Sequence, residues 1–195
     1  CTDSSILMRN TSINNNSSRN GGGLYIGNTA TVHMWMGSYI NNNYAYNNGG
    51  GVYIGEKACF LLTDNNIYQN NCAKNGMGVY VRGKFQMFSI ASVDESNEVY
   101  LTRQTYISII DRLLKPSGYV AVIRTTLTDP GTIIAQVEYS TDAQKELYYI
   151  GDAVAELNNQ NCVKKFLVRN ISGNKILRPT KFVKAYVDNE IIISE

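Results

Sequence analysis

The sequence predicts an all-β fold: a parallel β-helix whose coils of about 27–28 residues hold three strands each, followed by irregular C-terminal coils or a cap. Three observations predict it: an internal repeat, short apolar strands separated by Gly and Asn, and the composition. Charged residues make up 17% of the 195 residues, below the roughly 25% of an average domain. Polarity rests instead on Asn, Ser, Thr and 14 tyrosines, which suits stacked strands and turns better than a helical bundle.

The repeat consists of a glycine-rich entry and a short strand. The segment Gly21–Ile26 recurs as Gly49–Ile54 and, with one glycine replaced by methionine, as Gly76–Val81. The three segments are almost evenly spaced, and an Asn-Gly pair opens each of them. A unit of this size cannot bury its own apolar side, so the units are expected to stack into a solenoid. Hairpins would place turns about every 8–12 residues, and WD40 blades need about 40–45 residues, so neither fits.

Two further strands follow in each unit. The second strand carries a pair of alternating apolar residues: Val32 and Met34, Phe60 and Leu62, and, after a shorter turn, Phe85 and Met87. The third strand ends on an Ile-x-x-Asn turn: Ile13–Asn16, Ile40–Asn43 and Ile67–Asn70. One residue inserted between Met34 and Ile40 leaves open whether Met34 or instead His33 or Trp35 faces inward.

Stacking in register would place like residues in columns about 4.8 Å apart. The expected inward columns are Leu24/Val52/Val79, Ile26/Ile54/Val81, Val32/Phe60/Phe85 and Ile13/Ile40/Ile67. The Asn of each Ile-x-x-Asn turn can then hydrogen-bond along the stack and satisfy turn backbone that would otherwise lack partners.

The candidate binding residues are four tyrosines: Tyr25, Tyr53, Tyr80 and Tyr100. Each lies between two inward aliphatic residues, so strand alternation places it on the outside of the first strand. The expectation is an exposed aromatic row along one face. Such a row suits sugar rings or a protein partner, but stacked rings also stabilise a sheet without binding anything, and both interpretations stay open.

These motifs resemble the polymorphic outer-membrane-protein repeats of chlamydial surface proteins and related adhesin-like repeat proteins. The matching residues are the glycine-rich stretches Gly21–Leu24 and Gly49–Val52, the Ile-x-x-Asn turns, and the aromatic-x-aliphatic strands Phe60–Leu62 and Phe85–Met87. The resemblance covers about half of the chain. It implies a right-handed parallel β-helix and a role in adhesion or cell-surface structure.

The second half of the chain lacks the Gly/Asn repeat. Strand-like runs separated by turn signals continue, so we expect β-helix repeats over residues 1–115 and an irregular β continuation or C-terminal cap over 116–195. A separate small β-domain from about residue 116 is the alternative. Helix-like patterns are confined to Asp142–Leu147 and Asp152–Leu157. A cap is expected because the open end of a solenoid exposes unpaired strand edges.

Catalytic and metal-binding motifs are sparse. A polysaccharide lyase or hydrolase on this fold would need two or three converging carboxylates. No acidic residue of the repeat half occupies the outward position of the first strand. We interpret the acidic group Asp94, Glu95 and Glu98 as a turn rather than a metal site. His33 has no acidic or Cys neighbour at a useful spacing. We therefore predict neither a cofactor nor a metal site.

Other bulk features limit partners and compartment. The net charge of +2 argues against a nucleic acid partner, and no apolar stretch reaches the roughly 20 residues of a transmembrane helix. Four cysteines without metal-ligand spacing are compatible with a disulfide or with burial as small apolar side chains: Cys1, Cys59, Cys72 and Cys162.

The function expected from the sequence is that of a non-enzymatic, extracellular or cell-surface β-solenoid acting in adhesion or as a spacer. Its partner would be a glycan or protein on a host or neighbouring cell. The alternative is a carbohydrate-active β-helix enzyme.

Overall fold

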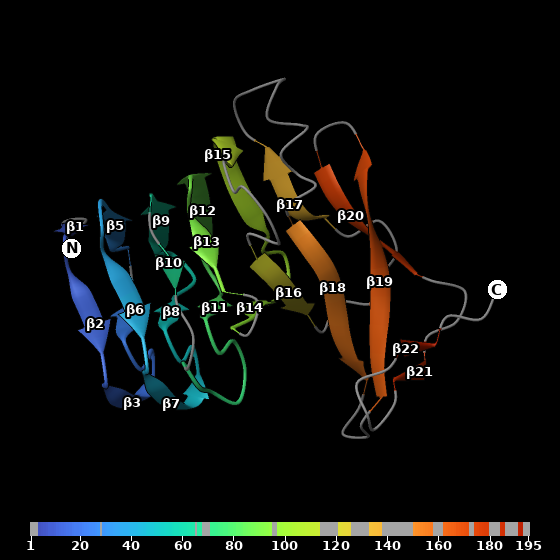
Figure 1. The fold of residues 1–195 in the computed structure, drawn as a ribbon, viewed down its shortest axis with the longest axis horizontal. Coiled ribbons are helices and arrows are strands. Elements are labelled where there is room, and N and C mark those ends of the chain that lie inside the picture. Colours follow the sequence, from blue (N-terminus) through green and yellow to red (C-terminus); the bar gives the residue numbers. More distant parts are fainter. Residues whose placement is uncertain are drawn as a thin grey trace.

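A computed structural model of the chain describes residues 4–27, 29–64, 66–67, 71–94, 97–113, 121–125, 133–137, 150–157, 162–171, 174–179, 184–185 and 191–192. All regular structure within these residues is β, without a helix. Parallel strands stack coil upon coil along one axis into a β-solenoid, with the N-terminal coil at one end (Figure 1). The predicted all-β parallel β-helix is confirmed.

The coils have two long faces and one shorter face. The first face holds β4 (Leu24–Ile26), β8 (Val52–Ile54), β11 (Val79–Val81), β14 (Val99–Leu101), β16 (Ala121–Thr125) and β18 (Ile150–Leu157). The second face holds β1 (Ser5–Arg9), β5 (Thr31–Trp35), β9 (Cys59–Thr63), β12 (Lys84–Ser89), β15 (Ile107–Leu113) and β17 (Ile133–Val137). The third holds β2 (Ser12–Asn14), β6 (Tyr39–Asn41), β10 (Asn66–Ile67) and β13 (Ser92–Val93).

The first two coils each contain a fourth strand that the sequence did not predict. These strands are β3 (Ser17–Asn20) and β7 (Tyr44–Asn48), which pair in parallel. Isolated bridges from Tyr44 to Cys72 and from Asn48 to Asn75 extend this pairing into the third coil. No apolar alternation in the sequence could predict these strands, because they consist mainly of Ser, Asn and Tyr with a single small apolar residue, Ala45.

Columns of matched apolar side chains fill the interior as predicted. On the first face Leu24 pairs with Val52 and Val52 with Val79, and the parallel columns through Ile54, Phe60 and Ile40 keep the same register. Phe60 and Phe85 are fully buried and their rings stack with centroids 5.7 Å apart. Burying a side chain of this size stabilises the fold by about 1.5–3 kcal/mol.

Met34 is the inward residue of its strand. It is fully buried beneath the pairing partner Leu62, whereas His33 and Trp35 are half-buried on the opposite side of the strand. The inserted residue is absorbed in the following turn, where Met36 and Gly37 adopt φ of 47° and 71°. A turn can take up an extra residue without reversing the strand, because left-handed backbone changes direction sharply.

An asparagine ladder links the turns after the third face. The side-chain oxygen of Asn43 accepts the backbone N–H of Asn16 at 3.0 Å, and the Oδ1 atoms of Asn71 and Asn97 repeat this contact with the N–H groups of Asn43 and Asn71. The predicted ladder is thus confirmed for its first two members. Its third member is Asn71 and not Asn70, which lies outside the described residues, because the turn after Ile67 is one residue longer.

The coil after β11 is shortened. Val79 pairs with Val99, and these partners are much closer in the sequence than the paired Leu24 and Val52 of the first coils. In the preceding coil the carbonyl of Asn75 accepts the Gly49 N–H. Among the described residues of the shortened coil, no strand corresponds to β7 and no backbone carbonyl accepts the equivalent Gly76 N–H. The Glu98 carboxylate, 9% exposed as a residue, accepts the corresponding Gly76 N–H at 3.2 Å.

Antiparallel strands close the C-terminal end. Strand β18 pairs with β19 (Cys162–Ile171), β19 with β20 (Asn174–Pro179), and β20 with β17, so that the last strands of both long faces are hydrogen-bonded. A separate pair, β21 (Lys184–Ala185) and β22 (Ile191–Ile192), follows. Pairing both edges leaves neither open for association with another chain, as the predicted cap requires.

One prediction in this half is wrong. The segment Asp152–Leu157 is not helical but belongs to strand β18. Its neighbours β16 and β19 pair with it on both sides, and sheet pairing overrides the helical preference of its Ala, Glu and Leu residues. The second helix-like pattern, Asp142–Leu147, lies outside the described residues, as does the predicted boundary at residues 115 and 116.

Candidate functional site

The four predicted tyrosines form one continuous stack on the outside of the first face. Ring centroids are 4.9 Å apart between Tyr25 and Tyr53, 5.3 Å between Tyr53 and Tyr80, and 5.2 Å between Tyr80 and Tyr100. The ring planes are within 5°, 13° and 14° of parallel. Strand register places each ring directly above the next, and each aromatic pair contributes about 0.5–1.5 kcal/mol beyond its burial.

The expectation that this whole row is exposed is wrong. Tyr25 is 58% exposed, but Tyr53 is 8% and Tyr100 is 9% exposed. Each inner ring is covered on both sides by its neighbours, and the Arg124 guanidinium lies 5.9 Å over Tyr100 at the far end. Tyr25 is the first ring of the stack in the described part of the chain. The inner tyrosines therefore present edges and hydroxyl groups.

A notch lies beside the stack, where the chain turns from the first face to the second. These corners comprise residues 27–30, 55–58, 82–83 and 102–105 in successive coils, so the third is two residues shorter than its neighbours. Gly83 makes this tight corner possible. A Cβ atom on Gly83 would overlap the carbonyl oxygens of Gly55 and Ala58 in the preceding corner.

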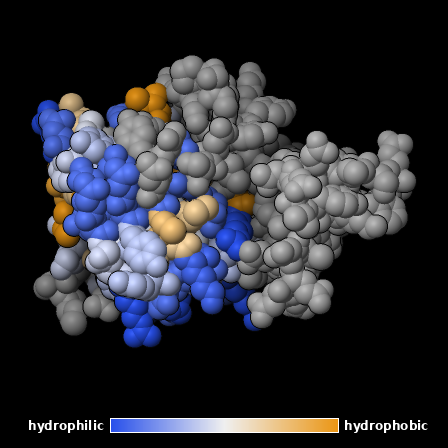
Figure 2. Space-filling view, turned by 60° about the horizontal axis from the view of Figure 1, so that its bottom comes forward, coloured by the Kyte–Doolittle hydropathy of each residue, from blue (hydrophilic) through white to orange (hydrophobic). Residues whose placement is uncertain are grey.

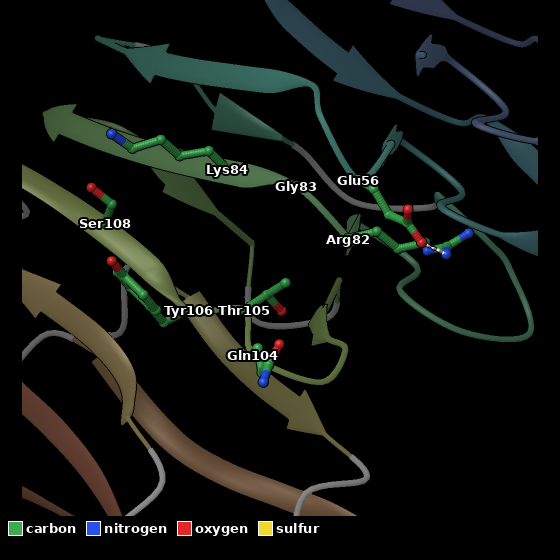
Figure 3. A pocket seen from close by; sticks show the side chains of 8 residues that line it. All are labelled: Glu56, Arg82, Gly83, Lys84, Gln104, Thr105, Tyr106 and Ser108. Carbon is green, nitrogen blue, oxygen red and sulfur yellow. Dashed lines mark hydrogen bonds and ion pairs between the residues drawn. The ribbon is translucent and has the colours of Figure 1, made fainter. Parts of the chain in front are cut away.

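Three open depressions, of about 350, 560 and 470 Å³, meet around this short corner. Glu56 and Arg82 line all three. We call the combined depression the corner groove; its lining residues include Tyr25, Tyr53, Lys57, Tyr80, Arg82, Lys84, Arg103, Gln104 and Ser108. Figure 3 shows Arg82 and Gly83 between Glu56 of the preceding coil and Gln104 and Thr105 of the next. The groove thus forms because this corner is two residues shorter than the corners before and after it.

An ion pair divides the groove. The Arg82 guanidinium pairs with the Glu56 carboxylate and also donates a hydrogen bond to the Tyr53 hydroxyl at 3.3 Å. These contacts tie the tyrosine stack to the groove floor. Burial and the neighbouring phenols raise the pKa of Tyr80 above its ordinary value, so its hydroxyl group is neutral at physiological pH.

The groove is rich in basic side chains. Among the described side chains, one acidic residue, Glu56, lines it together with four exposed basic residues: Lys57, Arg82, Lys84 and Arg103. Sequence reasoning missed this group, because its members belong to three different coils and only the stacking brings them together. The available signal was the shortened turn before Phe85, which marked the notch.

His33 and Glu98, two possible site residues from the sequence, contact other residues of the fold. His33 is hydrogen-bonded to the Thr63 hydroxyl at 3.2 Å and packs against Trp35. Glu98 pairs with Arg124 at 3.3 Å in addition to Gly76. Within the described part of the chain, His, Cys, Asp and Glu nowhere gather in the threes that a metal ion requires.

The two cysteines with described side chains carry thiols. Cys59 is half-buried, with its Sγ 3.3 Å from the Gln86 side-chain oxygen, and Cys72 is exposed, contrary to burial as a small apolar residue. The side chains of Cys1 and Cys162 lie outside the described residues. Among the described residues no helix has the length and apolar character needed to cross a membrane.

Comparison with known proteins identifies no relative. No family model matches the chain, and neither a curated protein nor a solved structure is significantly similar to it.

Proposed function

We propose that this protein is a non-enzymatic, extracellular or cell-surface β-solenoid that acts in adhesion by binding a glycan on a host or neighbouring cell. The observation that carries the proposal is the corner groove, whose lining places the exposed ring of Tyr25 beside hydrogen-bonding and charged groups. A flat aromatic face next to hydrogen-bonding groups in a depression is a common arrangement for holding a sugar ring. The resemblance of the repeats to adhesin-like surface proteins points in the same direction.

A glycan fits this surface better than an apolar protein partner. Figure 2 shows a face on which the described residues are mostly hydrophilic and the hydrophobic ones are isolated from one another. Large protein interfaces are usually centred on a contiguous apolar patch. The groove lining is also mainly polar, with hydroxyl, amide and charged groups from Thr102, Gln104, Thr105 and their neighbours.

The rival function is a carbohydrate-active enzyme. Glycoside hydrolysis requires two carboxyl groups facing the scissile bond. Glu56 is the one carboxylate among the described side chains that line the groove, and Arg82 already pairs with it. Incubating the protein with a panel of polysaccharides and assaying reducing ends and unsaturated products separates the two functions.

The binding test uses two tyrosines of similar exposure. Tyr25→Ala removes an exposed ring that lines the groove, whereas Tyr46→Ala removes a 66% exposed ring on β7 that lies outside the groove. On a glycan array and by calorimetry with its best ligand, Tyr25→Ala should weaken binding about tenfold, and Tyr46→Ala should leave it unchanged. Equal binding by both variants and the unmodified protein would refute the proposal. The inner ring Tyr53 is unsuitable, since its truncation opens the stack.

A further inference from the structure

We infer that the corner groove binds a linear anionic polysaccharide, with one sugar ring on Tyr25 and its carboxylate or sulfate groups paired with the basic side chains of the groove. The inference rests on the proposed function and specifies the class of glycan. It follows from the charge of the groove, the accessibility of that charge, and its spacing along the solenoid.

Charge is concentrated in the groove. Lys84 has an interaction partner of its own. The other basic residues of the groove, Lys57, Arg82 and Arg103, and its one acidic residue among the described side chains, Glu56, leave a balance of +2, which equals the formal net charge of the entire chain of 195 residues. The rest of the molecule is therefore close to neutral. A local excess of one sign in a depression attracts ligands of the opposite sign and speeds their association.

This charge is accessible to a ligand. Lys57 and Arg103 are exposed, and no acidic side chain among the described residues pairs with either. The Arg82 side chain is 43% exposed. It uses one N–H group toward Tyr53 and another toward Glu56, so part of its five-donor fork remains for an anion.

The groups follow one another along the solenoid axis. Tyr25, Lys57, Arg82 and Arg103 come from four successive coils, and coils are about 4.8 Å apart. Three such steps span roughly 14 Å, the length of a short oligosaccharide. Tyr25 and Lys57 line one depression, and Arg82 and Arg103 line the next. A chain with an anionic group on successive sugars matches this sequence of contacts.

The tyrosine stack argues against single-stranded nucleic acid as the ligand. Proteins that bind it offer a series of open aromatic faces on which successive bases stack. Here the faces of Tyr53, Tyr80 and Tyr100 are covered by neighbouring rings and by Arg124. The stack therefore offers no series of open faces for successive bases, whereas a polysaccharide relies more on polar contacts, which the groove lining provides.

The test compares charged polymers with neutral ones of the same backbone. Dextran sulfate is paired with unsulfated dextran, and polygalacturonate with its methyl ester, so that sulfate and carboxylate are tested separately. Polyglutamate and a single-stranded oligonucleotide serve as controls, because both are anionic polymers but neither is a polysaccharide. Calorimetry or biolayer interferometry on the full chain gives the affinity at low salt and at physiological salt.

Matched variants locate the contact. Lys57→Gln/Arg103→Gln removes two charges from the groove, and Arg19→Gln/Lys74→Gln removes two exposed charges elsewhere. The groove variant should bind the anionic polysaccharide about tenfold more weakly, because exposed ion pairs contribute little individually but act together here. The control variant should bind normally, and raising the salt concentration should weaken binding of the unmodified protein.

The outcomes separate this inference from the proposed function. Tyr25-dependent binding of neutral and charged polymers with equal affinity would overturn the anionic specificity and leave glycan binding intact. Binding of polyglutamate or the oligonucleotide as tightly as the anionic polysaccharides, or an equal loss in both double variants, would also overturn it. Absence of binding to every polysaccharide, charged or neutral, would refute both.

Discussion

The side-chain oxygen of Asn43 accepts the backbone N–H of Asn16, which lies one coil earlier in the chain, at 3.0 Å. The Asn43 side chain is almost completely buried, at 1% residue exposure, and its amide nitrogen donates to the backbone carbonyls of Ile13 and Asn41 at 2.9 and 2.8 Å. One side chain thus satisfies turn backbone in two coils. Turn backbone of stacked coils needs such partners wherever packing against the next coil removes it from water.

Replacing Asn43 should therefore destabilise the fold strongly. In Asn43→Ala the Asn16 N–H and the two carbonyls lose their partners in a partly buried site, and we expect a loss of about 2 kcal/mol in the free energy of unfolding. Asn47→Ala, which removes a half-buried amide from the same coil, should cost less than about 0.5 kcal/mol. Urea denaturation measures both. Similar losses in the two variants would show that the ladder contributes no special stability.

The Glu98 carboxylate should stabilise the fold by accepting the Gly76 N–H, as the Asn75 carbonyl accepts the Gly49 N–H in the preceding coil. If its main role is to accept the Gly76 N–H, Glu98→Gln keeps an acceptor oxygen and retains most of the stability, whereas Glu98→Ala loses about 1–3 kcal/mol. If the ion pair with Arg124 dominates, both variants lose the same amount. Thermal unfolding of the two variants distinguishes these cases, and we expect the first.

Sequence reasoning could predict whatever repeats with the coil. The inward columns through Val52 and Phe60 and the tyrosine stack followed from the period alone, since matched residues in stacked coils must share a column. The exposure of Tyr53 could not be predicted from one sequence position, because it depends on the rings above and below. The basic groove could not be predicted for the same reason. It arises from a difference in corner length between coils rather than from a motif.

Gly83 should be essential to the short corner. In Gly83→Ala the new methyl group overlaps backbone oxygens of Gly55 and Ala58, which cannot move without displacing the preceding coil, so we expect a loss of about 2 kcal/mol or more. The matched control is Gly27→Ala in the first corner, where the Cβ atom would lie 2.8 Å from the ring of the exposed Tyr25. A ring at the surface can swing aside. Chemical denaturation should show a large loss only for Gly83→Ala.

His33 should make stability depend on mildly acidic pH. Burial lowers the pKa of His33 below its ordinary value of about 6.5, and the nearby Asp64 opposes this only in part. The unfolded chain then binds a proton more readily than the folded one, so stability falls as the pH drops from the ordinary value to the lowered one and becomes constant below that. The free energy of unfolding, measured by urea denaturation between about pH 7.5 and pH 5, should decline less in His33→Gln than in the unmodified protein. Carboxyl groups titrate in both proteins, so the difference between their slopes isolates His33. Parallel slopes would mean that His33 is protonated equally easily in the folded and unfolded chains.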